Sequence, residues 1–216
     1  MQRDAQFWND AAEAFAFLGN SLLAPMNQTG TVGIEPSFWD AFPTYGDVCV
    51  AEAVDTCRTY AQAAQESAQA SGDPVQDASV EYTHLFVGPP HPAAAPWETM
   101  YRPESEGATV GFGQATYEMR SLLRDAGLEV SNQNNQYADH IGIELLYASV
   151  LCDRAREVVS DDAEWSAAVS SLVSYLRSHP LVWVGKLRAA VDKEAKDGYI
   201  SNLLKLAEAL ANVIAS

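Results

Sequence analysis

The chain has 216 residues, of which 48% are hydrophobic, enough for a sizeable core, and we expect one domain spanning residues 1–216. Its formal net charge is −16, and its 13 Lys and Arg residues are too few to neutralise a nucleic-acid backbone, so we expect a basic partner and no nucleic acid. No segment approaches the roughly 18 uncharged apolar residues that span a bilayer, and no basic segment followed by an apolar run opens the chain. These observations predict a cytoplasmic protein without an integral membrane segment. The cysteines at positions 49, 57 and 152 form no CxxC pair, which predicts reduced thiols.

The first third of the chain carries helix signals. Over residues 4–23, apolar side chains recur with the 3.6-residue period of one buried helical face. An apolar cluster at residues 38–42 indicates a helical turn or two. The Ala-rich segment 47–70 has strong helix propensity. Asp73 followed by Pro74 is a typical helix start, and this helix should run to about Val87.

A proline-rich segment, residues 88–92, stops that helix, because proline removes backbone donors and restricts the preceding residue. The loop that follows, near 88–108, is unusually long for a compact domain, which indicates a functional or mobile segment. Thr109 is expected to cap the next helix, which closes at Gly127. The buried side of this helix should carry Phe112, Thr116, Met119 and Leu123.

An Asn/Gln-rich connector over residues 132–136 precedes the last predicted helices, which span 137–159 and 162–177, with two more after Pro180 divided at Gly198. No segment alternates with period two, so no strand is required. The sequence predicts an all-α, single-domain bundle of about eight to nine helices.

Enzyme signatures are absent from the sequence: it holds no GxSxG, HExxH or GxxxxGK[ST] motif, so we expect no catalytic residue, no metal and no cofactor. One alternative stays open. Asp139, His140 and Glu144 are close in sequence, and His140 and Glu144 should share one helical face, as a metal-dependent or hydrolytic enzyme would require. Such a site needs further ligands from Glu81 or Glu98, because the other histidines have no ligand spacing.

Three motifs occur in order along the chain. They are Glu81-Tyr82-Thr83-His84-Leu85-Phe86-Val87-Gly88-Pro89, then Ala95-Pro96-Trp97-Glu98-Thr99-Met100-Tyr101, then Tyr137-Ala138-Asp139-His140-Ile141-Gly142-Ile143-Glu144-Leu145. Together they resemble the TorD/DmsD family of redox-enzyme maturation chaperones, related to the NarJ group, in which E-Y-x-x-L-F-x-G-P, P-W-E-S/T-x-Y and D-H-I-G-x-E-L segments recur. The segment 178–183 also resembles a late apolar segment of that family, so the likeness covers about residues 75–210.

The resemblance implies an all-helical chaperone that holds the twin-arginine signal peptide of a molybdenum-containing oxidoreductase precursor until cofactor insertion and folding are complete. A scaffold for the mature oxidoreductase subunit is the alternative within the same class. The resemblance also allows either a monomer or a domain-swapped dimer, since a long hinge-like loop permits exchange.

The peptide-binding residues that the resemblance implies match Tyr82, Leu85, Phe86, Pro96, Trp97, Asp139 and His140, with possible support from Glu81, Glu98 and Glu144. Signal peptides pair a basic region with an apolar one, so a receptor needs an apolar groove beside carboxylates. We expect Trp97 and Phe86 to hold the apolar part and Asp139 to attract the arginines. Leu85 and Phe86 are also typical of the core of a helix end. Tyr82 stands where family members often have Trp.

Overall fold

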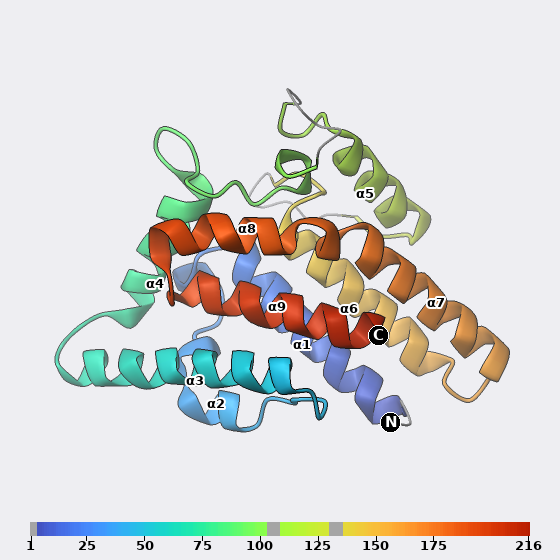
Figure 1. The fold of residues 1–216 in the computed structure, drawn as a ribbon, viewed down its shortest axis with the longest axis horizontal. Helices are drawn as coiled ribbons and strands as arrows, with labels where there is room; N and C mark the ends of the chain where they lie inside the picture. The colour runs from blue at the N-terminus through green and yellow to red at the C-terminus, as the bar shows by residue number, and fades with distance from the viewer. Residues whose placement is uncertain (1–3, 103–108, 130–135) are drawn as a thin grey trace. The chain divides into compact units, whose positions relative to one another are not determined.

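The computed structural model describes residues 4–102, 109–129 and 136–216. Within these ranges the regular structure is helical, and the sole extended pairing is an isolated antiparallel bridge between Trp97 and His140. The predicted all-α fold is therefore confirmed (Figure 1). None of the described helices combines the length and the apolar character that crossing a bilayer requires. The α-helices are α1 (Ala5–Leu23), α2 (Pro36–Asp40), α3 (Val48–Gln69), α4 (Pro74–Tyr82), α5 (Gln114–Asp125), α6 (Ile141–Glu157), α7 (Asp162–Ser178), α8 (Pro180–Ala195) and α9 (Tyr199–Ala215).

Two compact units make up the chain. Unit 1 comprises residues 1–23, 96–184 and 214–216, and unit 2 comprises residues 24–95 and 185–213. The expectation of one domain over residues 1–216 stays a prediction. Four shorter helical segments also occur in the described residues: η1 (Met26–Gln28), η2 (Val32–Ile34), the π-helix η3 (Thr83–Val87) and η4 (Glu98–Met100).

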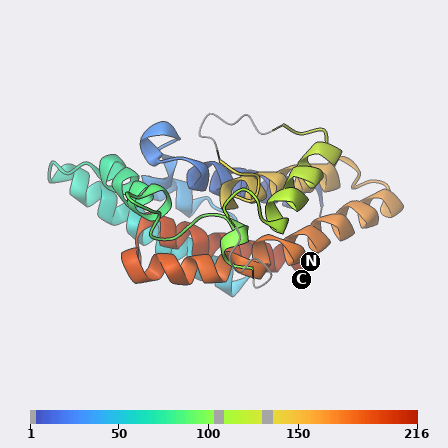
Figure 2. The ribbon, with the colours of Figure 1, turned by 90° about the horizontal axis from the view of Figure 1, so that it is seen from above.

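The core of unit 1 is built on α1 and α6, which lie side by side in both views (Figure 1, Figure 2). Glycines let their backbones approach closely: a Cβ atom added to Gly19 would lie 2.8 Å from the carbonyl oxygen of Gly142. Helix α7 packs on α6, and the Tyr175 hydroxyl donates a hydrogen bond of 2.9 Å to the Glu144 carbonyl oxygen. Leu172 and Leu176 of α7 are fully buried.

In unit 2, an aspartate side chain caps the start of α3 and another caps the start of α4, the second as predicted for Asp73. The Asp47 side chain accepts hydrogen bonds from the first turn of α3, and Asp73 accepts one from the Gln76 amide at 3.0 Å. The predicted helix to Val87 is correct in extent, but its last turn is the π-helix η3. It ends at Gly88, whose φ of 91° favours glycine.

Two predicted helix starts are wrong. The helix expected from Thr109 begins at Gln114, because Gly111 has a φ of 83° and Gly113 is extended, and Phe112 is 68% exposed rather than buried. Its other expected core residues, Thr116, Met119 and Leu123, are buried. The helix expected from residue 137 begins at Ile141, after the extended bridge residue. Loop residues 103–108 and connector residues 132–135 lie outside the described residues.

Candidate functional site

The second and third motifs form one structural element in unit 1. The Glu98 amide donates to the Asp139 carbonyl oxygen at 2.9 Å, and the Ile141 amide donates to the Pro96 carbonyl oxygen at 3.0 Å. These bonds flank the bridge between Trp97 and His140. The end of the long loop is thereby fixed to the N-terminus of α6, although about 40 residues separate the two segments in sequence.

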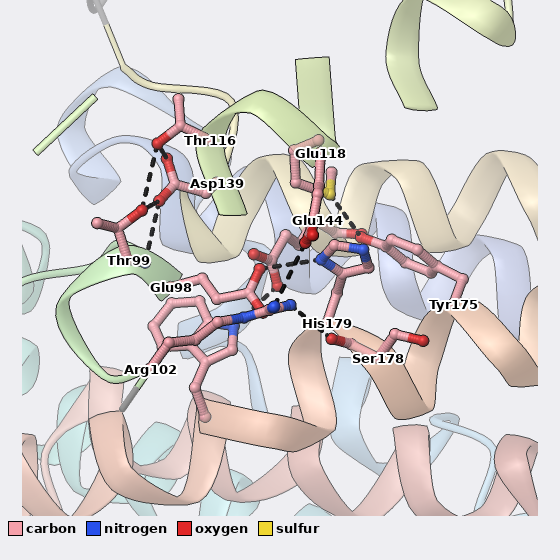
Figure 3. A network of polar contacts seen from close by, with 12 residues as sticks. Glu98, Thr99, Arg102, Thr116, Glu118, Asp139, Glu144, Tyr175, Ser178 and His179 are labelled. Atoms are coloured by element: carbon pink, nitrogen blue, oxygen red, sulfur yellow. Dashed lines mark hydrogen bonds and ion pairs between the residues drawn. The ribbon is translucent and has the colours of Figure 1, made fainter. Parts of the chain in front are cut away.

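Asp139 lies at the centre of a buried hydrogen-bond network (Figure 3). Its Oδ2 atom accepts hydrogen bonds from the Thr99 hydroxyl at 2.6 Å and from the Thr99 amide at 3.1 Å, and its Oδ1 atom accepts one from the Thr116 hydroxyl at 2.9 Å. The carboxylate thus joins η4, α5 and the start of α6. The side chain is fully buried, and these three donors fix its position. The expected attraction of arginines by Asp139 stays a prediction.

His140 caps helix α6. Its Nδ1 atom accepts a hydrogen bond of 3.0 Å from the Gly142 amide, which satisfies one of the unpaired amides of the first turn. The ring is fully buried, and this burial lowers its pKa to about 3. His140 is therefore neutral at physiological pH. It precedes α6, so the expectation that it shares a helical face with Glu144 is wrong.

Trp97 is half-buried and stands between aromatic neighbours. Its ring contacts the Tyr137 ring edge-on at 6.2 Å and the His140 ring edge-on at 6.2 Å. Tyr137 is also half-buried, whereas Pro96 is buried. Of the residues expected in the binding surface of unit 1, Trp97 is thus the one that retains access to solvent.

Glu98 and Glu144 face each other in a second buried network. Arg102 contacts Oε1 of Glu98 at 2.6 Å, and Nδ1 of His179 lies 3.0 Å from its Oε2. The Trp183 indole donates to Oε2 of Glu144 at 3.0 Å. Burial, and after it the negative charge of Glu98, raises the pKa of Glu144 well above its ordinary value. The protonated form of Glu144 is thereby favoured relative to an exposed glutamic acid.

This second network also ties the long loop to the junction of α7 and α8. Arg102 donates to the Ser178 carbonyl oxygen at 2.7 Å, and the Tyr101 ring stacks on the Trp183 ring at 5.4 Å. Sequence reasoning placed none of Arg102, His179 and Trp183 in the site. A local signal existed, because Glu98 and Arg102 are four residues apart, as are His179 and Trp183.

The first motif belongs to unit 2. Tyr82, Leu85 and Phe86 are all buried, and the rings of Tyr82 and Phe86 contact edge-on at 5.3 Å. The Glu81 carboxylate accepts hydrogen bonds from the Tyr199 amide at 3.1 Å and the Ile200 amide at 2.8 Å, so it caps helix α9. Glu81 thus has a structural role, and its grouping with Trp97 in one surface stays a prediction.

The enzyme alternative named Asp139, His140 and Glu144. In the structure each of them has its own hydrogen-bond partners. Asp139 accepts from two threonines, His140 accepts from the Gly142 amide, and Glu144 accepts from Trp183. They do not form a ligand set. In the described part of the chain, the group whose possible ligand atoms lie within 4.8 Å of one another is Glu98, Glu144 and His179.

Comparison with known proteins gives the family. The model of the family described as nitrate reductase delta subunit matches residues 48–189, which is more than half of the chain and includes all three motifs. The chain belongs to the nitrate reductase delta subunit family. This membership, together with the relatives described next, confirms the likeness to the TorD/DmsD chaperones.

Curated relatives of this nitrate reductase delta subunit family member carry chaperone names. A probable Tat proofreading chaperone DmsD of Haemophilus influenzae is 28% identical over 108 residues, 50% of this chain and 45% of the relative. The Tat proofreading chaperone DmsD of Salmonella typhi is 31% identical over 75 residues, 35% of each chain. The chaperone protein TorD of Shewanella pealeana is 24% identical over 132 residues, 59% of this chain and 54% of the relative. The matched segments thus span about half the length of these relatives or less.

Proposed function

We propose that the protein is a cytoplasmic chaperone that binds the twin-arginine signal peptide of a molybdenum-containing oxidoreductase and holds the precursor for cofactor insertion before export. Membership in the nitrate reductase delta subunit family and the names of its relatives support this proposal. The net charge of −16 suits a basic peptide segment and steers its approach. In this proposal the chain carries no catalytic residue.

The observation that carries the proposal is the setting of Trp97. A half-buried indole on a loop that two networks hold in place is a pre-organised anchor for an apolar side chain. In this proposal Asp139 and His140 support Trp97 by fixing the loop to α6, rather than by contacting the peptide. Pro96 completes the turn into this loop, since its carbonyl oxygen accepts the hydrogen bond from Ile141.

The first motif contributes to peptide binding by rearrangement. Leu85 and Phe86 lie in the π-helix η3, a rare conformation that often occurs at functional sites, and exposed Val87 follows them. In the proposal, opening of η3 presents Leu85, Phe86 and the neighbouring Tyr82 to the apolar part of the peptide. Hydrogen exchange of residues 82–87 should therefore change on addition of peptide.

Calorimetric titration with a synthetic peptide that has paired arginines and an apolar segment tests the proposal. Truncating a central aromatic anchor costs about 2 kcal/mol, so Trp97→Ala should weaken binding about 30-fold. Trp165→Ala is the matched control, because Trp165 is a half-buried indole on α7 that contacts Trp8 at 6.5 Å and lies outside the motifs. Wild-type affinity in a folded Trp97→Ala variant would contradict the proposed anchor.

The scaffold alternative separates cleanly from signal-peptide binding. A chaperone for the signal peptide binds the isolated peptide, whereas a scaffold for the mature subunit binds the enzyme after the peptide has been removed. Measuring both affinities at 50 and 500 mM NaCl also tests the charge argument, since screening should weaken binding of the basic peptide at the higher salt concentration. Light scattering during the same experiment distinguishes a monomer from a domain-swapped dimer.

A further inference from the structure

We propose that Glu98, Glu144 and His179 form a binding site for one divalent transition-metal cation of the zinc type. The three side chains come from η4, α6 and the residue between α7 and α8, and one possible ligand atom of each lies within 4.8 Å of the others. Ligand atoms around one zinc ion lie about 3–4 Å apart, so a small contraction of side chains completes the set. One imidazole and two carboxylates match the ligands that zinc accepts.

A buried atom marks the place for the cation. Oε1 of Glu144 is fully enclosed and has no hydrogen-bond donor among the described residues, whereas Oε2 accepts the Trp183 indole hydrogen bond. A buried carboxyl oxygen without a donor is costly, and a bound cation removes that cost. The Trp183 hydrogen bond in turn orients Glu144, as outer partners of metal ligands usually do.

The charges balance with and without the cation. Without it, Glu98 pairs with Arg102. With it, the two carboxylates of Glu98 and Glu144 neutralise the two positive charges. Arg102 then pairs with Glu118, whose Oε2 atom already lies 3.3 Å from Nη1 of Arg102. The arginine is therefore compatible with the site, because its second partner replaces the first.

A pocket lies next to one of the ligands. It has a volume of about 590 Å³ and lies between α5, α6 and α7 in unit 1, and His179, which is 6% exposed, forms part of its wall. Other residues of that wall are Tyr147, Leu151, Ser174, Tyr175 and Ser178. Tyr175 stacks on the His179 ring at 5.2 Å and holds it in the wall. Water from this pocket supplies the remaining coordination position on the His179 side.

The sequence did not indicate this site. Glu98 and Glu144 are 46 residues apart and His179 follows 35 residues later, which matches no known spacing of metal ligands. The expectation of no metal depended on the lack of such a spacing. The proposed cation joins η4, α6 and the residue between α7 and α8, and its role is structural, so the expectation of no catalytic residue is unchanged. The inference is independent of peptide binding at Trp97, which is not a ligand.

Titration of chelator-treated full-length protein with zinc chloride at pH 7 tests the proposal. Wild type should bind one zinc ion, and Glu144→Gln should weaken binding by more than about 100-fold, because loss of outer partners alone costs about 10–100-fold. This variant should fold, since its amide oxygen can accept the Trp183 hydrogen bond and its NH₂ group can donate to Glu98. His179→Gln should produce a similar loss.

The controls are His91→Gln and Cys49→Ser, which change exposed side chains of types that can bind zinc but that lie outside the proposed site. Both should retain wild-type affinity, and X-ray absorption should show nitrogen and oxygen ligands without sulfur. The proposal is overturned if wild type binds no zinc, if folded Glu144→Gln binds it as tightly as wild type, or if a control variant removes binding. Titration of the same variants with the signal peptide tests the proposed function separately, because Trp97 is not a ligand of the cation.

Discussion

The Thr99 hydroxyl donates a hydrogen bond of 2.6 Å to Oδ2 of Asp139, which lies 40 residues further along the chain. Because the same carboxylate also accepts hydrogen bonds from the Thr99 amide and the Thr116 hydroxyl, it is the common acceptor of three buried donors. Its burial is thus compensated, and the donors depend on it in turn.

Replacing Asp139 by Ala should lower the free energy of unfolding by about 3 kcal/mol, since it removes the acceptor of three buried hydrogen bonds. Asp139→Asn should cost much less, because the amide oxygen can accept from Thr99 while the Thr116 hydroxyl rotates to accept from the NH₂ group. Urea denaturation measures both variants. Equal stability of Asp139→Ala and wild type would show that the network contributes nothing to folding.

His140 should make stability depend on pH. Its folded-state pKa of about 3 lies below the ordinary value of 6.5, so the unfolded state binds the proton more readily. The stabilisation is complete above pH 6.5 and is lost progressively as the pH falls toward 3. Between pH 7 and 5 this group alone should lower the free energy of unfolding by about 2 kcal/mol.

His140→Asn isolates the contribution of this titration. Asparagine is a good N-cap, so it can accept the hydrogen bond from the Gly142 amide without titrating. Urea denaturation at pH 7 and 5 should show a loss that is about 2 kcal/mol smaller in this variant than in wild type. The exposed His91→Gln variant should retain the wild-type pH dependence. An unchanged pH dependence in His140→Asn would contradict the buried, neutral imidazole.

Gly142 should be intolerant of a side chain. A Cβ atom there would lie 2.7 Å from the Gly19 carbonyl oxygen, so Gly142→Ala must push α6 away from α1. We expect a loss of about 2 kcal/mol in thermal or urea denaturation, typical of overpacking. Gly30→Ala is the control, because a Cβ atom at Gly30 meets nothing within 4 Å. A neutral Gly142→Ala would mean that the two helices can separate without cost.

Glu81 and Gly198 should be energetically coupled within unit 2. Glu81→Ala removes the cap of α9 and should cost about 1 kcal/mol. A Cβ atom on Gly198 would lie 2.5 Å from Oε2 of Glu81, so Gly198→Ala should displace the same carboxylate. The double variant should therefore lose less than the sum of the single losses in a double-mutant cycle. Strict additivity would show that Gly198 does not make room for the cap.

Local signals determined much of the helical fold. The caps at Asp47 and Asp73 and the end of α1 before Pro25 depend on residues within one turn of each boundary, so they are legible in the sequence. The apolar period of residues 4–23 likewise identifies the face that α1 buries. The motif order indicated the family, which the match over residues 48–189 confirms.

Only the tertiary structure decided what the motif residues do. The start of α6 moved to Ile141 because a bridge to Trp97, distant in sequence, holds His140 extended. Asp139 became a buried acceptor, and Glu98 and His179, which are 81 residues apart, became partners. Such pairings need the folded core, because only folding removes these side chains from water and brings residues distant in sequence within hydrogen-bond distance. No periodicity or spacing along the chain encodes them.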